Sequence, residues 1–418
     1  MRFPSAMRLA GLISLAATWA GPTLAADGEQ CGYRVGSNGT AELSPACEPQ
    51  LAAMASDDER AGLLFRLGYS MNEDDAQIGA LAALQRAVAL APNSARYWTE
   101  LGFTQGDLGY YHEALISLDR AIELDPASAD GLNERGWVKQ NLGDFAGANA
   151  DYDRVFSIDS SADGARLAFA KNLVWLGQLD EAEAVFAALA GAPDNADTIA
   201  EQRRLIARIR AYQPTGNEIS VCTMDEAISD KARAELVFDA CTRAYLDADD
   251  DVKKADFLTV RSTARVVIEQ SMDANYDDLA VAAGLDPQNG DRFSNLGFAL
   301  LQKRHSWAAR NDFDHALELG LQSDLATAVA MAGRARANWN LDEREAAVAD
   351  ARRSIDVQPN EAATWLLGDI AFEEGDRNMA RDMWIATYRL GARDDGLVDA
   401  LKSVGVDNPE SWHSDAAS

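Results

Sequence analysis

The chain has 418 residues, with 67 acidic and 38 basic side chains and a formal net charge of −29. A surface this negative repels phosphates and anionic lipids, which argues against nucleic acid and membrane surfaces as partners and favours a basic one. The alternative interpretation is that the charge only keeps solvated helix faces soluble. A chain of this length would ordinarily form two or three globular domains, unless it is a repeat array whose units pack only on their neighbours.

The first 25 residues have the pattern of a secretory signal. Arg2 and Arg8 precede an apolar run over residues 9–20, and small residues at 23–26 follow it. The run is short for a membrane span of about 20 residues, so an uncleaved anchor is the weaker interpretation. We therefore expect residues 1–25 to be a cleavable signal peptide and the mature chain to be periplasmic or secreted, with no membrane span.

Four cysteines would remain after export, and the simplest pairing in an exported protein is two local disulfides. Cys31 and Cys47 would staple a turn-rich segment, 26–60, that caps the array. Cys222 and Cys241 lie 19 residues apart, about 28 Å along a straight helix. A bond between them therefore requires Cys222 to fold back onto the helix that carries Cys241. Neither pair has CxxC spacing, which favours structural roles over redox or zinc chemistry.

A pattern of large, small and helix-stopping residues recurs every 34 residues between position 61 and about position 196. In its best-formed copy, residues 95–128, a first helical run is followed by a glycine turn and by a second run that a proline ends. That copy carries Trp98, Leu101, Gly102, Gly109, Ala114, Leu118, Ala121 and Pro126. The copy 61–94 carries Leu64, Leu67, Gly68, Ala80, Leu84, Ala87 and Pro92 at the same offsets, and the copies 129–162 and 163–196 keep many of them. The pattern predicts four helical hairpins.

These residues resemble the tetratricopeptide repeat family, whose 34-residue signature has a large residue, Leu-Gly, small residues, an aromatic residue and a proline at these offsets. The resemblance implies an all-α fold, an α-solenoid of helical hairpins. Three residues depart from the signature: Arg135 where leucine is usual, Ser160 where proline is usual, and Arg166 at the large-residue position. They weaken single copies and leave the resemblance intact.

After position 196 the pattern breaks for about 60 residues. We interpret residues 197–255, which include a basic helical run at 202–210 and the second cysteine pair, as a helical junction. A second, more degenerate block over 256–395 is expected to contain repeats 256–289, 290–323, 328–360 and 361–394. A capping helix and a polar tail, 396–418, would follow. The solenoid then consists of two blocks of about four repeats each, with a small disulfide-stapled N-terminal segment.

The resemblance also implies a binding surface, because tetratricopeptide arrays bind peptides or protein segments in a concave groove lined by their first helices. The ninth residue of each repeat belongs to that groove, which gives a row of Tyr69, Phe103, Trp137 and Lys171. Other groove positions hold Phe65, Asn72, Arg96, Asn133 and Gln140. Rings would supply contact area, and amides would hydrogen-bond a peptide backbone. The alternative is that the rings only pack between adjacent first helices. The family's paired Lys and Asn for a terminal carboxylate are not reproduced.

The sequence offers little for catalysis, for a cofactor or for a metal ion. The four histidines, His112, His305, His315 and His413, form no motif with another ligand or nucleophile. Asp247, Asp249 and Asp251 alternate as in a calcium loop, but Val252 and Leu258 stand where that loop needs Gly and Glu, so a solvated acidic loop is favoured. We therefore expect no enzyme, no cofactor and no metal site. An unrecognised active site within 197–255 is the least favoured hypothesis.

The combined prediction is a non-enzymatic scaffold for protein–protein interaction, periplasmic or secreted, that binds a peptide or protein segment in its groove during envelope assembly or secretion. The charge favours a basic segment as the partner. A second hypothesis, of a different class, is a periplasmic recognition subunit for a glycan or a peptidoglycan fragment, because aromatic rows also stack on sugars.

Overall fold

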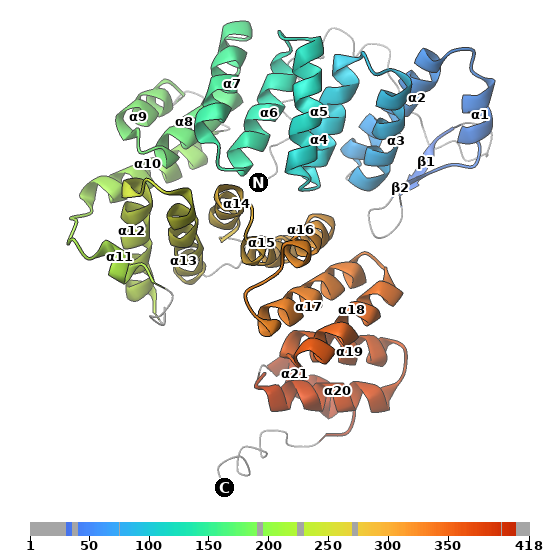
Figure 1. The fold of residues 1–418 in the computed structure, drawn as a ribbon, viewed down its shortest axis with the longest axis vertical. Helices are drawn as coiled ribbons and strands as arrows, with labels where there is room; N and C mark the ends of the chain where they lie inside the picture. Colours follow the sequence, from blue (N-terminus) through green and yellow to red (C-terminus); the bar gives the residue numbers. More distant parts are fainter. Residues whose placement is uncertain are drawn as a thin grey trace. The chain divides into compact units, whose positions relative to one another are not determined.

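The computed structural model describes residues 31–35, 41–74, 76–189, 195–223, 230–269, 275–393 and 395–406. The expected signal peptide, most of the expected polar tail and His413 lie outside these residues. The described residues form helices and one small sheet in two compact units, of which unit 1 ends at Ala264 and unit 2 begins at Arg265 (Figure 1). In the described part of the chain, every helix is too short or too polar to cross a membrane.

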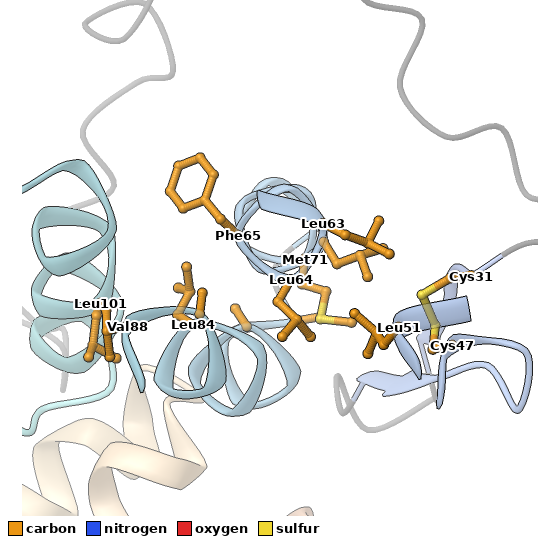
Figure 2. Close-up of a cluster of buried hydrophobic side chains, with 14 residues drawn as sticks. Cys31, Cys47, Leu51, Leu63, Leu64, Phe65, Met71, Leu84, Val88 and Leu101 are labelled. Atoms are coloured by element: carbon orange, nitrogen blue, oxygen red, sulfur yellow. A yellow bond between two sulfur atoms is a disulfide. The ribbon is translucent and has the colours of Figure 1, made fainter. Parts of the chain in front are cut away.

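Unit 1 begins with a stapled cap. Strands β1 (Tyr33–Val35) and β2 (Ala41–Leu43) pair antiparallel, and helix α1 (Cys47–Ala53) follows them. A disulfide joins Cys31 to Cys47, as expected from the sequence. Figure 2 shows how Leu51 lies between this disulfide and the first hairpin, so that the cap and the hairpin share one buried apolar cluster.

Four helical hairpins follow the cap in unit 1, and the two helices of each hairpin pack directly on each other. Their first helices begin within a few residues of the positions at which the 34-residue pattern begins. The hairpins are α2 (Asp57–Glu73) with α3 (Gln77–Leu90), α4 (Ala95–Asp107) with α5 (Tyr111–Leu124), α6 (Ala129–Asn141) with α7 (Phe145–Ile158), and α8 (Asp163–Trp175) with α9 (Leu179–Ala188).

The glycines of the pattern have two physical tasks. A Cβ on Gly102 would lie 2.5 Å from Cγ of Leu118, so only glycine allows α4 and α5 to approach so closely. Gly109 has a φ of 85° in the turn between those helices, a left-handed conformation that costs other residues about 1 kcal/mol. Both requirements recur with the repeat, and this explains why glycine recurs at the same offsets.

Helices continue through the segment interpreted as a junction. Helix α10 (Ala196–Ala211) packs on α8 and α9, and α12 (Lys231–Asp247) packs on α10. The short helix α11 (Glu218–Val221) lies between them in sequence and packs against α12. Cys222 folds back onto α12 and forms a disulfide with Cys241, with their Cα atoms 4.9 Å apart, which confirms the expected bond.

A buried arginine holds the end of unit 1 together. Arg261 lies on α13 (Asp251–Glu269), and only 4% of its surface is exposed. Its guanidinium lies 4.8 Å from the ring centre of Trp175 on α8, and 5.5 and 5.7 Å from those of Phe238 and Tyr245 on α12. Cations stack favourably on aromatic faces, particularly where water is excluded. This contact adds to the buried alanines of α12 and α13, which pack as small residues do in the regular hairpins.

Unit 2 contains the second series of hairpins. Helices α15 and α16, α17 and α18, and α19 and α20 pack as pairs, and α21 covers the last of them. In two of the turns, Arg304 (φ 61°) and Asp342 (φ 63°) adopt the left-handed conformation that glycine adopts in unit 1. The helices of unit 2 after α13 are α14 (Tyr276–Leu285), α15 (Gly290–Gln302), α16 (Ser306–Leu319), α17 (Asp324–Asn340), α18 (Arg344–Val357), α19 (Glu361–Glu373), α20 (Arg377–Leu390) and α21 (Asp395–Ser403).

Candidate functional site

The first helices of unit 1 form a continuous series, because α2 contacts α4, α4 contacts α6, and α6 contacts α8. Side chains at one repeat position therefore recur on neighbouring helices. The ninth-residue row consists of Tyr69 on α2, Phe103 on α4, Trp137 on α6 and Lys171 on α8. All four side chains are half-buried, so each is partly packed and partly accessible to solvent.

Trp137 is the best-fixed member of the ninth-residue row. A Cβ on Gly106 of α4 would lie 2.6 Å from Cζ3 of the indole, so the ring lies directly on the α4 backbone. Tyr111 of α5 meets the same ring edge-on, with centroids 6.2 Å apart. Trp137 therefore contributes to packing between repeats, and the part of the ring that remains accessible is held rigidly in place.

Phe65 lies deeper than the row. It is buried, and Tyr97 of α4 stacks on it with ring centroids 4.6 Å apart. The guanidinium of Arg96 lies 4.7 Å from the centre of the same ring. Of this pair of predicted groove residues, Arg96 is the exposed one and Phe65 is a contact between α2 and α4. Phe65 therefore offers little surface to a ligand.

The predicted amides differ in their surroundings. The Asn72 side chain donates hydrogen bonds to Oε1 of Glu100 at 2.7 Å and to Oγ1 of Thr104 at 2.8 Å, both on α4. It therefore links two neighbouring first helices. Asn133 donates to Glu134 at 3.5 Å, a long contact. Among the described residues, Oδ1 of Asn72 and Oε1 of Gln140 are both buried without a hydrogen-bond partner, so each of these amides keeps an acceptor unused.

An ionic clasp, formed by Arg135, Lys139 and Asp151 of the hairpin that carries Trp137 and by Asp119 of the preceding hairpin, lies close to the row in sequence. Arg135 donates to both carboxylate oxygens of Asp151, from Nε at 2.9 Å and from Nη2 at 2.5 Å, and Nη1 reaches Asp119 on α5 at 2.7 Å. Lys139 donates to Asp151 at 2.8 Å. Burial alone would raise the pKa of Asp151, but the hydrogen bonds from Arg135 and Lys139 outweigh burial and leave the pKa below its usual value.

In the sequence, Arg135 was notable only because it stands where the repeat pattern usually has leucine. An arginine stands at the same repeat position in unit 2. Arg334 on α17 binds both oxygens of Asp350 on α18, at 2.8 and 2.6 Å, and reaches Asp314 on α16 at 2.7 Å. Asn338 donates to Asp350 in the place that Lys139 takes in unit 1. A signal was present in the sequence: in both repeats an aspartate follows the arginine after 16 residues.

Sequence reasoning named no groove residue in unit 2, although the ninth residues there follow from the same register. They are Phe298 on α15, Arg336 on α17 and Asp369 on α19, helices that contact each other in that order. Asp369 accepts hydrogen bonds from Arg336 at 3.5 Å and from Nε1 of Trp384 at 3.2 Å. Burial raises the pKa of Asp369 despite these partners. This row thus has one ring and two charged side chains, whereas that of unit 1 has three rings and one charged side chain.

The histidines within the described residues lie at the surface or pack against a ring. His112 and His305 are exposed, and His315 meets Phe293 edge-on at 4.4 Å. In the described part of the chain, His, Cys, Asp and Glu side chains do not gather in a group of three or more that could hold a metal ion. Of the sites described above, the ninth-residue row of unit 1 best combines side chains fixed by packing with surface that a ligand can reach.

Two family models, both described as tetratricopeptide repeat, match this chain over residues 95–128 and 142–209. The first match coincides with the best-formed copy of the pattern, and the second covers α7, the hairpin α8–α9 and most of α10. The chain therefore contains tetratricopeptide repeats. The expected family and the α-solenoid fold with two disulfides are thereby confirmed. Tetratricopeptide arrays are typically non-enzymatic and use their extended surface to bind proteins or peptides.

Solved structures of tetratricopeptide proteins resemble the chain. One is a tetratricopeptide repeat protein from Parabacteroides merdae, 13% identical, with a TM-score of 0.30, covering 82% of this chain and 98% of that one. Another is YrrB, described as a tetratricopeptide protein with an unusual peptide-binding site, 15% identical, with a TM-score of 0.26, covering 59% of this chain and 96% of that one. A search of curated protein sequences found no match.

Proposed function

We propose that this tetratricopeptide protein is an exported, non-enzymatic scaffold whose unit 1 binds an extended segment of a partner protein along the ninth-residue row. The observation that carries the proposal is the recurrence of half-buried rings, Tyr69, Phe103 and Trp137, on three first helices that contact each other in order. Rings held by packing lose little conformational freedom when they bind a ligand, so they are effective contact residues.

The proposed partner segment is basic. The chain carries a net charge of −29, and carboxylates such as Glu100 lie on the same first helices as the rings. A basic segment would be attracted over a distance set by the salt concentration. Export is supported by the two disulfides, since such bonds persist in oxidising compartments, and by the signal-like pattern of residues 1–25. Envelope assembly or secretion is the corresponding biological setting.

A recovery experiment with envelope extract tests this function. The intact chain, Ile116→Ala and the triple variant Tyr69→Ala, Phe103→Ala, Trp137→Ala are each immobilised. Ile116 is the matched control, because it is an apolar side chain on α5 that is 70% exposed and lies outside the row. We expect the same partner with the intact chain and with Ile116→Ala, and at least a tenfold loss with the triple variant, equivalent to about 1.4 kcal/mol.

Two further measurements decide the outcome. Circular dichroism must show that the triple variant keeps its helices, since Trp137 also packs on Gly106. If its helices are lost, the double variant Tyr69→Ala, Phe103→Ala replaces it. Equal recovery of the partner by the intact chain and by a folded variant would contradict binding along the ninth-residue row.

The charge of the partner is tested by salt. Raising the salt concentration from 0.1 to 0.5 M should weaken binding of a basic segment, and binding that is insensitive to salt contradicts the proposed charge of the partner.

A further inference from the structure

Asp312, on α16 of unit 2, is a buried carboxyl group without a countercharge. Only 5% of the residue is exposed, and its Oδ2 has no hydrogen-bond partner among the described residues. A charged carboxylate in such a place loses its hydration without compensation, which is among the most costly arrangements in a protein interior. The proposed binding function of unit 1 gives no role to this buried carboxyl.

The same repeat position holds a carboxylate in two other hairpins, where it is neutralised. Asp151, Asp350 and Asp312 each lie 22 residues after the start of their repeat, at 129, 328 and 290. The arginine that binds the first two occupies the seventh position of its repeat, and the Lys or Asn that assists occupies the eleventh. In the repeat of Asp312 these two positions hold Leu296 and Leu300. The third hairpin thus has the carboxyl of the clasp without its donors.

The cationic groups on the three helices that pack together here, α15, α16 and α17, all have other contacts. Each of the four arginines pairs with another carboxylate, and the histidine lies against a ring. They are Arg292 with Asp286 at 3.3 Å, Arg310 with Glu343 at 2.8 Å, Arg334 with Asp314 and Asp350 at 2.7 and 2.6 Å, Arg336 with Asp369 at 3.5 Å, and His315 with Phe293. The remaining charged groups on these helices, Asp291, Glu318 and Asp324, are acidic, so none of them supplies a countercharge to Asp312.

We propose that Asp312 is a proton-dependent joint of unit 2: the folded α15–α16 hairpin holds its carboxyl neutral, and ionisation of that carboxyl opens the hairpin. Burial raises the pKa of Asp312 well above its usual value, in agreement with this arrangement. Because the folded pKa is the higher one, the folded state binds the proton more tightly than the open state. Stability is therefore complete below the ordinary carboxyl pKa and is lost as the pH rises towards the raised value.

The expected size of the effect follows from proton linkage. A single group changes the opening equilibrium by at most tenfold for each pH unit between its two pKa values. The effect is local, so it is measured by hydrogen exchange, which reports the opening of separate segments of a protein. The full chain is exchanged between pH 4.5 and 8.5, and the rates of peptides from α15 and α16 are corrected for the intrinsic pH dependence of exchange.

The first comparison uses Asp312→Asn and, as a matched control, Asp324→Asn, because Asp324 is an exposed carboxylate at the start of α17 in the same unit. We expect the opening of α15–α16 to increase with pH in the native chain and in Asp324→Asn, by several-fold to tenfold per pH unit. Asp312→Asn should remove this increase. The proposal is overturned if Asp312→Asn keeps the native pH dependence, or if the native hairpin shows none.

A second variant installs the missing donor. Leu296→Arg places a guanidinium at the seventh position, where Arg135 and Arg334 bind their aspartates. We expect its α15–α16 hairpin to lose the opening at high pH. If Leu296→Arg does not fold, a carboxyl carbon-13 titration of the native chain, assigned with Asp312→Asn, decides instead. A titration midpoint well above the ordinary range supports the joint, and a midpoint within it overturns the joint.

Discussion

Hairpins α6–α7 and α15–α16 place an aspartate at the same repeat position and surround it differently. Asp151 is held by Arg135 and Lys139, whereas Asp312 faces a repeat in which leucines occupy the donor positions. In α4–α5 the aspartate position holds Ser117, which donates to Gln105 at the eleventh position at 2.6 Å, so the pair there is neutral. The repeat fold thus determines which two positions are in contact, whereas the residue types at those positions differ from one hairpin to the next. The chemistry then decides how each hairpin responds to pH and to mutation.

The largest effect is expected from removing the guanidinium of a clasp. Arg135→Met leaves Asp151 buried with only Lys139, and Arg334→Met leaves Asp350 with only Asn338. Breaking a buried ion pair on one side costs about 3 kcal/mol, so each variant should lower the opening free energy of its own hairpin by that amount. Hydrogen exchange of α6–α7 and of α17–α18 measures it.

The exposed pair of Arg120 with Glu123, at 3.0 Å, is the control for this prediction. Arg120→Ala should change the opening free energy by less than about 0.5 kcal/mol, since exposed ion pairs contribute little. If Arg135→Met and Arg334→Met were as mild as Arg120→Ala, the clasps would not stabilise their hairpins.

Acid should weaken the clasp of unit 1, which is the opposite of its expected effect on α15–α16. Because the folded pKa of Asp151 lies below the ordinary value of 3.8, its stabilising contribution is present above that value and is lost as the pH falls through the folded pKa. The difference in opening free energy between the native chain and Arg135→Met should therefore shrink below about pH 4. A difference that stays constant from pH 6 to pH 3 would show that ionised Asp151 does not carry the effect.

The smallest effect concerns the turns, where unit 2 departs from unit 1. Arg304 adopts a φ of 61° in the turn between α15 and α16, where Gly109 adopts 85° in the turn of α4–α5. Arg304→Gly should relieve this conformation and stabilise its hairpin by about 1 kcal/mol, and Gly109→Ala should destabilise α4–α5 by a similar amount. Urea titration followed by hydrogen exchange measures both. Destabilisation by Arg304→Gly would mean that the arginine side chain contributes more than its backbone costs.

Much of the fold could be predicted from the sequence because its causes are local and repeated. Gly102 and Leu118 recur at fixed offsets since each hairpin needs the same close approach of two helices. The two disulfides followed from an even number of cysteines and from their proximity in the chain. The contact of Arg261 with three rings on α8 and α12 was harder to recognise, because nothing like it occurs in the regular repeats from which the pattern was read.

The surroundings of single side chains could not be predicted in the same way. Register places Phe65 and Tyr69 on the same helix face, yet Tyr97 covers Phe65, while Tyr69 stays partly accessible. Whether a side chain is covered depends on neighbouring side chains from the next repeat, which a pattern within one repeat does not contain. Asp312 is the same case: its lack of donors follows from two leucines that a hydrophobic pattern treats as ordinary core.

The central claim, that the ninth-residue row binds a protein segment, is tested most directly by site-specific photo-crosslinking in cells. A photo-crosslinking amino acid replaces Phe103 in the row, Ile116 on α5, or Arg336 in the row of unit 2. The account predicts one dominant crosslinked protein at position 103 and at least tenfold less of it at position 116. Equal crosslinking at positions 103 and 116, or crosslinking only at position 336, would contradict it.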